Sequence, residues 1–538
     1  MAPPDRIEDK HNLTWGAIGY NHLDVAQKEG QQVLDATLGH IVKRVDSQAG
    51  QQGRLAVTVF NPNGWERTGV ATTGRIYPLP PDSKDLLVKD ASGRVVPSQI
   101  IKSKKDSQGN LVVADVAFLA DKVPSVGYDT YYLEFTPGVA QPAATDLRRD
   151  EHAFVLENDH VQVKVSPSHG AIISLIDKRT GRQMLDAQKS PFPVFKGRPN
   201  PDYPLPSDFV RWWGPNEAMP IPALFDSSKS RAASTGAGSA TPSADAVDWR
   251  GVAQSEVRWI ERGPLRATVR TRHNWPLLKF ESSVTLYAGL PHVEVATRVL
   301  AEVPPPPDKF EKFPGGFPTR LKEGYWLTLA PGFAVDTVVR DFPLGVEPTT
   351  HDAFQALTFL DLAGHECGLL VLHAGTQYFN RDADGVFSNL LMREWESFWS
   401  GEYGFPRYSE YRHALVPHGS SFTNVERLRA AAEFTQKLIT VVGPPQKGSL
   451  PKRKGFIAVG PETVLLSAFR KKEGSGFELR VVEMEGREVA ATVELPQRIA
   501  GADETDLLGR KLREATRSGN KLSFHVKPWK IGSFGVTF

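Results

Sequence analysis

The segment 154–185 constrains the fold more than any other part of the chain, because it reads as successive β-strands joined by turns. Valines alternate with polar residues along Val161–Val165, which is the period-2 pattern of a half-buried strand. The turn-forming sequence Pro-Ser-His-Gly follows it, and Ala171–Ile176 is a second apolar run. Asp177–Gly181 forms another turn, which returns the chain to Met184. The segment therefore predicts a meander of antiparallel strands.

Short alternating or apolar runs bounded by turn residues continue along most of the chain and predict a mainly β protein. One stretch differs, because apolar residues between Gln31 and Asp46 recur at helical spacing. A single amphipathic helix cannot bury its own apolar face, so we expect it to pack on another element. An apolar patch around Val33, Leu38 and Ile41 is the expected docking surface.

Changes in composition divide the sequence into four regions. We expect a short helical N-terminal segment (1–50), a small β-sandwich (54–138), a large β-supersandwich (151–443) and a terminal β-sandwich-like domain (452–538). A length of 538 residues is enough for several domains of ordinary size.

The composition bounds the function broadly. A net charge of +2 gives no field that points to nucleic acid or an anionic membrane. Cys367 is the sole cysteine, so a disulfide within the chain is impossible, and its apolar surroundings favour a buried thiol. The sequence shows no membrane-spanning run and no visible signal peptide, so we expect a soluble protein whose localisation is unknown.

Several segments carry a resemblance to one family. Leu156-Glu-Asn-x-x-Val161, followed by Ile173-Ser-Leu-Ile-Asp-Lys-Arg-Thr-Gly181, resembles the strands that open the large β domain of α-mannosidases in glycoside hydrolase family 38. Val59-Phe-Asn-Pro-Asn-Gly-Trp-Glu-Arg67, Val96-Pro-Ser-Gln99 and Val526-Lys-Pro-Trp-Lys-Ile531 resemble other β segments of that family, in the same order. Each motif is weak alone, and their order over most of the chain carries the resemblance.

The resemblance implies the C-terminal, non-catalytic region of an α-mannosidase-like protein, with a galactose-mutarotase-like supersandwich as its large domain. Family members are retaining enzymes whose zinc ion and aspartate nucleophile sit in an N-terminal barrel, and retaining glycosidases use two carboxyl groups about 5–5.5 Å apart. This sequence has no room for the barrel before the helix. The resemblance therefore implies no catalytic and no metal-binding residue here, with zinc expected only alongside the missing barrel.

Two segments imitate zinc-binding motifs. Asn21-His-Leu-Asp24 resembles the family's His-x-Asp, and His11-Asn-Leu-Thr-Trp-Gly16 resembles its His-Asp-x-x-x-Gly. Zinc needs at least three protein ligands, and no further cluster supports either segment. We interpret the first as a helix start with Asp24 near the N-cap, and the second as a remnant of the family's helical bundle.

The sequence 393–413 is rich in aromatic, arginine and glutamate residues. Rings stack on the apolar faces of sugars while charged groups bond hydroxyls, so Arg393, Trp399 and Tyr403 are candidate sugar-binding residues. The alternative, that the aromatic residues fill the core, is the more common use of buried rings.

Three functions remain open at this point. The first is a C-terminal β region that supports or shapes a sugar site and acts with a separately encoded catalytic barrel, itself inactive alone. The second is a stand-alone carbohydrate-binding module. The third is an independent supersandwich enzyme such as a polysaccharide lyase, for which Tyr403, Arg393 and His413 would have to converge.

Overall fold

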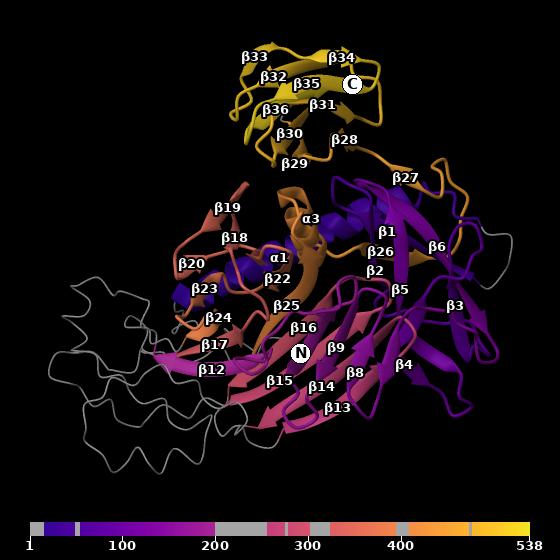
Figure 1. Cartoon of the computed structure of the whole chain (residues 1–538). Coiled ribbons are helices and arrows are strands. Elements are labelled where there is room, and N and C mark those ends of the chain that lie inside the picture. Colours follow the sequence, from indigo (N-terminus) through magenta and orange to yellow (C-terminus); the bar gives the residue numbers. More distant parts are fainter. Residues whose placement is uncertain are drawn as a thin grey trace.

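Layers of antiparallel sheet make up most of the protein, as the sequence predicted (Figure 1). The structure, a computed structural model, describes residues 15–48, 54–199, 255–274, 278–301, 323–393, 408–472 and 476–538. Within these ranges it contains strands β1–β36 and two helices, α1 and α3. Neither helix is long and apolar enough to cross a membrane in the described part of the chain.

Helix α1 (Trp15–Val42) begins well before the residue expected from the apolar pattern. Leu38 is buried against Phe60 and Tyr128 of the small sandwich. Val33 is 68% exposed. The expected patch around Val33, Leu38 and Ile41 is therefore wrong as a single exposed surface, because one side of the stripe packs within this chain.

The small sandwich pairs a five-stranded sheet with the three-stranded sheet β2-β5-β4. Its core contains Val57, Phe118 and Leu133. Two short strands that follow the large domain in sequence, β26 and β27, also belong to the first of these sheets. The strands are β1 (Arg54–Asn61), β2 (Arg67–Thr72), β3 (Asp85–Lys89), β4 (Ser98–Lys105), β5 (Leu111–Val123), β6 (Gly127–Thr136), β26 (Ile439–Gly443) and β27 (Lys454–Gly455).

The large domain is a supersandwich in which a nine-stranded sheet shares one core with two five-stranded sheets. The nine-stranded sheet has the order β13-β14-β15-β16-β25-β22-β21-β18-β19. The five-stranded sheets are β11-β10-β9-β8-β7 and β12-β17-β24-β23-β20. The strands are β7 (Arg148–Asp150), β8 (Val155–Glu157), β9 (Val161–Val165), β10 (Ile172–Asp177), β11 (Arg182–Gln183), β12 (Val194–Pro199), β13 (Ser255–Arg262), β14 (Arg266–Asn274), β15 (Leu278–Tyr287), β16 (Val293–Ala301), β17 (Glu323–Leu329), β18 (Thr337–Phe342), β19 (Gly345–Thr349), β20 (Ala353–Gln355), β21 (Phe359–Ala363), β22 (Cys367–Ala374), β23 (Tyr378–Arg381), β24 (Phe387–Arg393) and β25 (Tyr408–Gly419).

The meander predicted from the opening segment is confirmed in β8–β11. The asparagine of the motif, Asn158, has a structural role. Its buried side chain donates to the carbonyl oxygens of Tyr287 and Leu290. Gly170 has a φ of +69°, and a Cβ there would lie 1.7 Å from Thr271 Oγ1. Only glycine fits such a backbone at so close an approach.

Helix α3 (Asn424–Thr435) was missed in the sequence. It packs on the outer face of β21 and β22, the face turned away from the shared core. A capping box starts it: Thr423 Oγ1 accepts from the backbone N–H of Glu426, and the Glu426 carboxylate accepts from the backbone N–H of Thr423. This Thr-x-x-Glu pattern is a recognised helix-start signal.

The turn between β1 and β2 fastens the small sandwich to α3. Arg67 is buried and donates to the carbonyl oxygens of Glu433 and Gln436 at the end of the helix. Asn63 Nδ2 donates to Gln436 Oε1, and Trp65 Nε1 donates to the Glu433 carboxylate. Residues 59–69, which carried part of the resemblance, therefore hold the small sandwich against α3. Their side chains also donate to carbonyl groups at the end of the helix.

The terminal domain is a sandwich of the sheets β28-β31-β35-β34 and β29-β30-β36-β32-β33 around one apolar core. It lies at the top of Figure 1, beyond α3, where Val482 and Met484 pack against Val425 of the helix. The strands are β28 (Ala458–Gly460), β29 (Val464–Lys471), β30 (Phe477–Glu483), β31 (Val489–Glu494), β32 (Gly501–Thr505), β33 (Lys511–Glu514), β34 (Thr516–Ser518), β35 (Lys521–Val526) and β36 (Ile531–Thr537).

Candidate functional site

Among the predicted sugar-binding residues, Arg393 lies within the described part of the chain. Arg393 is the last residue of β24, where it pairs with Gly324 at the start of β17. Pro199, the last residue of β12, pairs with Glu323 beside them. Trp399 and Tyr403 lie outside the described residues.

Strands of the facing nine-stranded sheet end at neighbouring positions of that sheet. Ala301 at the end of β16 pairs with Leu278, and Leu300 pairs with Tyr408 at the start of β25. In Figure 1, β12 and the ends of β13–β15 are drawn on the same side of the domain. Loops at the end of a β-sandwich carry binding residues in many proteins.

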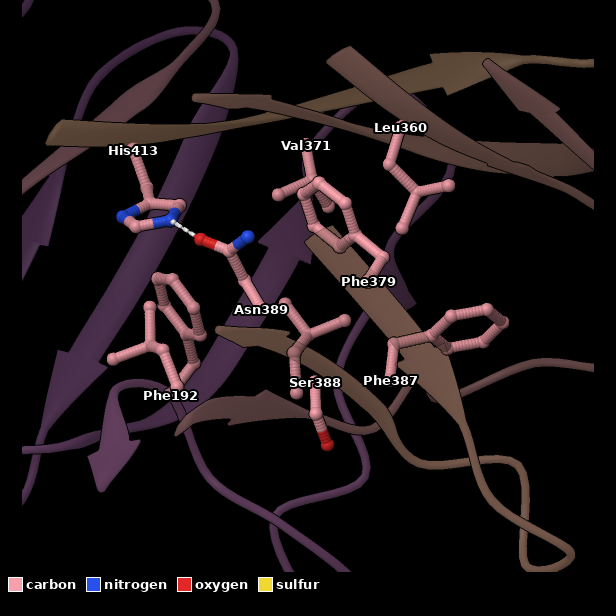
Figure 2. Close-up of a pocket in the computed structure, with 10 residues that line it drawn as sticks. Phe192, Leu360, Val371, Phe379, Phe387, Ser388, Asn389 and His413 are labelled. Atoms are coloured by element: carbon pink, nitrogen blue, oxygen red, sulfur yellow. Dashed lines mark hydrogen bonds between the residues drawn. The ribbon is translucent and has the colours of Figure 1, made fainter. Parts of the chain in front are cut away.

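A cavity among the described residues between the two sheets is too small for a sugar. This cavity of about 20 Å³ lies among apolar side chains and the polar groups of Ser388, Asn389 and His413 (Figure 2). A single water molecule needs roughly 10–15 Å³, whereas small-molecule sites span about 300–1,000 Å³. This space fits one water molecule.

Asn389 reaches across the interior from β24 to His413 on β25. His413 Nε2 donates to Asn389 Oδ1 at 3.1 Å, as drawn in Figure 2. The Asn389 amide nitrogen donates to the carbonyl oxygen of Tyr378 at 3.0 Å, which fixes the orientation of the amide. The polar contact therefore joins two facing sheets within an apolar core.

Two buried histidines of this interior are held neutral. Burial lowers the pKa of His413 to about 3, and nearby His373 adds to the effect. Burial also lowers the pKa of His373 to about 4, against a weaker opposing influence of Asp341. His373 packs edge-on against Phe379 with ring centroids 4.8 Å apart. These rings serve the core and have no access to a ligand outside it.

A second polar cluster fastens α3 to the outer face of the same sheet. Asp361 is fully buried; its Oδ1 accepts from His418 Nε2 at 2.7 Å, and its Oδ2 accepts from Arg427 Nε at 2.6 Å. Burial alone would raise the pKa of Asp361, but the donors His418 and Arg427 hold it below its usual range. A buried carboxylate that accepts from two side-chain donors is stable inside a protein when its partners stay in place.

The zinc-like segments do not fit a metal site in the described part of the chain. His22 is exposed and lies two residues from Asp24 within α1, and side chains at that spacing do not face each other. The expectation that Asp24 lies near the helix N-cap is wrong, because the helix begins at Trp15. His11 lies outside the described residues. The described ranges contain no group of three or more potential ligands.

The lyase-like set is not assembled among the described residues. His413 lies inside the core, while Arg393 ends β24 at the edge of the facing sheet. Cys367 is buried, as the sequence predicted, and the Arg182 guanidinium lies 3.6 Å from its sulfur. Sequence reasoning missed Asn389, Asp361 and Arg427, although the capping box would have revealed the helix that carries the last of them.

Known proteins share both the domains and the fold. The glycosyl hydrolases family 38 C-terminal domain matches residues 156–303. The glycosyl hydrolases family 38 C-terminal beta sandwich domain matches residues 463–534. These two segments match the C-terminal domains of glycosyl hydrolase family 38. No curated protein matches it.

Two crystal structures from the family resemble almost the whole chain. A glycosyl hydrolase family 38 protein from Enterococcus faecalis matches with a TM-score of 0.69 and 14% identity, over 97% of this chain and 62% of that one. An α-mannosidase from Enterococcus faecalis V583 matches with a TM-score of 0.68 and 13% identity, over 97% of this chain and 60% of that one. At such low identity the likeness shows a shared fold. The chain spans about three fifths of the length of these family 38 structures.

Proposed function

We propose that this chain is the β region of an α-mannosidase-like glycoside hydrolase, and that it supports a sugar site completed by a catalytic barrel on another polypeptide. The family 38 domains themselves support a carbohydrate function related to glycoside hydrolysis. The observation that carries the finer proposal is the match to an α-mannosidase along 97% of this chain but 60% of that one. Under this proposal the chain has no mannosidase activity alone.

The strand ends around Arg393 are the proposed sugar-facing surface. Support comes from the register, which brings Arg393 beside Gly324 and Glu323 at the edge from which the segment with Trp399 and Tyr403 continues. An arginine fork bonds vicinal hydroxyls, and aromatic rings stack on the apolar face of a sugar. The small cavity between the sheets supports a site at the end of the sandwich, since this cavity takes one water molecule.

The first experiment measures turnover of an aryl α-mannoside by the purified full chain, with and without added Zn²⁺. We expect no release of the aryl alcohol above the rate in buffer. Turnover by the purified chain would mean that the catalytic groups lie within it. That result would overturn the proposal of a separate barrel.

The second experiment titrates mannose oligosaccharides into the chain and into Arg393→Ala and Trp399→Ala variants. We expect binding that each substitution weakens by about tenfold, because removal of a buried stacking or charged contact costs roughly 1–3 kcal/mol. Trp529→Ala is the matched control, since Trp529 is 51% exposed in the terminal domain. Binding that survives both substitutions and falls with Trp529→Ala would place the sugar elsewhere.

The alternative of a stand-alone carbohydrate-binding module makes a different prediction for the same titration. A module that acts alone binds its oligosaccharide with an affinity suited to its task without any partner. A supporting region binds weakly until the rest of the site is present. Saturation at micromolar oligosaccharide by the isolated chain would favour the module.

A further inference from the structure

An open hollow of about 630 Å³ lies where the small sandwich meets the supersandwich. The small sandwich contributes the residues after β2, the supersandwich contributes β25, and the segment after α3 closes the third side. The polar side chains that line it are those of Thr72, Thr73, Arg412, Thr435, Gln436, Lys437 and Thr440. Its volume is in the range of small-molecule sites, and its lining does not include Arg393 or the residues paired with it.

Arg412 is fixed in the hollow by its neighbours. One guanidinium nitrogen donates to the carbonyl oxygen of Phe434 at 3.1 Å, and the guanidinium carbon lies 4.6 Å from the centre of the Phe434 ring. Alanines occupy the cross-strand positions on both sides, Ala296 on β16 and Ala374 on β22. A guanidinium has five N–H donors, so a rigidly held group with small neighbours retains donors for a ligand.

Lys437 brings a second positive charge to the hollow. Neither Lys437 nor Arg412 forms an ion pair with a carboxylate within the described residues. Two carboxylates act on the cations from farther away: Glu294, which lies 3.6 Å from His292 Nε2, and Glu410, which lies 3.1 Å from Arg298 Nε. Arg412 and Lys437 in turn help to lower the pKa of Glu294. The hollow therefore holds two cations that have a carboxylate nearby but no direct ion pair within the described residues.

The electrostatic surroundings of Lys437 disfavour its charged form. Loss of water around the ammonium group lowers its pKa, and the positive charges of Arg412 and Arg266 lower it further. Glu294 and Glu410 act in the opposite direction without reversing the shift. An anion in the hollow would relieve the repulsion between the cations.

Neutral polar groups lie beside the two cations. Gln436 Oε1 accepts from Asn63, so the amide is oriented with its Nε2 available on the other side. Thr440 Oγ1 donates to the carbonyl oxygen of Thr72, and Thr73 Oγ1 donates to that of Gly74, so toward a ligand these hydroxyl groups act as acceptors. Cations beside amide and hydroxyl groups match a ligand that carries both an anionic group and several hydroxyls.

We propose that this hollow binds an anionic saccharide, with the phosphate or carboxylate between Arg412 and Lys437 and the sugar hydroxyls toward Gln436 and the threonines. This site is separate from the sugar-facing surface proposed above and does not require a catalytic barrel. A comparable hollow of about 610 Å³ in the small sandwich has Asp85 in its lining beside Lys84 and Lys105, so its charge is mixed.

Calorimetric titration of the full chain tests the proposal with four probes: mannose 6-phosphate, glucuronate, mannose and inorganic phosphate. We expect at least one of the two anionic sugars to bind tenfold or more tightly than mannose and than inorganic phosphate. Equal affinity for mannose would overturn the role of the cations. Equal affinity for inorganic phosphate would overturn the role of the sugar.

Lys437→Gln identifies the site, because this rim residue can change without loss of core packing. We expect this substitution to weaken the anionic sugar five- to tenfold, and Lys437→Arg to keep most of the affinity. Lys447→Gln, at an exposed lysine outside the hollow, is the control. Unchanged binding by Lys437→Gln contradicts the proposal. A failure here leaves mannoside binding at Arg393 untouched, so the two proposals fail separately.

Discussion

Two histidines of one strand have different hydrogen-bond partners on the two faces of the nine-stranded sheet. His413 and His418 lie five residues apart on β25, so their side chains point to opposite faces. Both are buried, at 2% exposure each. His413 meets an amide oxygen inside the sandwich, whereas His418 meets the carboxylate of Asp361 beneath α3.

His413 and His418 differ in their hydrogen-bond partners and not in their depth of burial. Without a carboxylate, burial favours the neutral ring and lowers the pKa of His413 to about 3. His418 has an acceptor at each ring nitrogen, Asp361 Oδ1 at Nε2 and the Gly419 carbonyl oxygen at Nδ1. Both ring nitrogens of His418 therefore have a hydrogen-bond partner within the protein. The outer face of the nine-stranded sheet thus holds the charged side chains of Asp361 and Arg427, whereas the inner face holds the neutral ring of His413.

The largest effect is expected from Asp361→Ala, which removes the carboxylate and leaves Arg427 and His418 buried without it. Breaking a buried ion pair in this way costs about 3–5 kcal/mol of unfolding free energy. Urea denaturation followed by tryptophan fluorescence measures the loss. Asp352→Ala, at an exposed aspartate of the same domain, is the control and is expected to stay within about 0.5 kcal/mol. A comparable small loss for Asp361→Ala would contradict the charged cluster.

The next effect concerns pH. His373 and His413 have pKa values lowered from 6.5 to about 4 and about 3, so the unfolded chain binds protons that the folded protein does not. Their contribution to stability is complete above pH 6.5 and is lost as the pH falls toward 4, by about 1.4 kcal/mol per pH unit and histidine. The contribution of Asp361, whose pKa is lowered from 3.8, is lost only below that value.

Urea midpoints measured between pH 7 and pH 4 test this order of events. The double variant His373→Leu and His413→Leu is expected to show a flatter dependence on pH than the natural protein. His152→Gln, at an exposed histidine, is expected to leave the slope unchanged. Parallel slopes for the natural protein and the double variant would show that the two rings are protonated in the fold.

A smaller effect is expected from Asn389→Leu, which removes the acceptor of His413 Nε2 and the donors to the carbonyl oxygens of Tyr378 and Thr376. A buried polar group left unsatisfied costs about 1–3 kcal/mol. Adding His413→Leu removes the Nε2–H group that has lost its acceptor. In a double-mutant cycle, the double variant is therefore expected to regain part of the lost unfolding free energy. Strict additivity would show that the hydrogen bond drawn in Figure 2 contributes no coupling.

The smallest effect is expected at Phe422, whose ring stacks on His418 at 4.3 Å and lies 6.0 Å from the Arg427 guanidinium. Phe422→Leu keeps an apolar side chain and removes the ring's attraction for cations, which is about 0.5–1 kcal/mol at a partly exposed position. Thermal unfolding gives the shift. In an Asp361→Ala background, where the cluster is already broken, the same substitution is expected to have a smaller effect.

The β character and many strand positions followed from local pattern, since alternation along Val161–Val165 and the turns around it fix one buried face. The family resemblance was also a matter of local sequence, and its motifs proved to be turns and clasps such as Asn158 and Arg67. The start of α1 was missed because residues 22–33 are mostly exposed and have no apolar stripe to mark the helix.

The candidate site was foreseen only in part. Arg393 was chosen from an aromatic and charged run, and the strand pairing that brings it beside Glu323 and Pro199 joins residues far apart in sequence. The hollow with Arg412 and Lys437 was not foreseen, because its walls come from β2, β25 and the segment after α3. Proximity of this kind depends on long-range pairing, which no local pattern reports.

The sequence by itself determined that this protein is built from β layers, that it resembles the C-terminal region of family 38, and that Cys367 is buried. The tertiary structure decided which histidine of β25 faces a carboxylate and which faces an amide, and which cations line the hollow between the domains. The physical reason is that alternation assigns a residue to a face, whereas the charge it meets there is set by whichever distant strand or helix packs against that face.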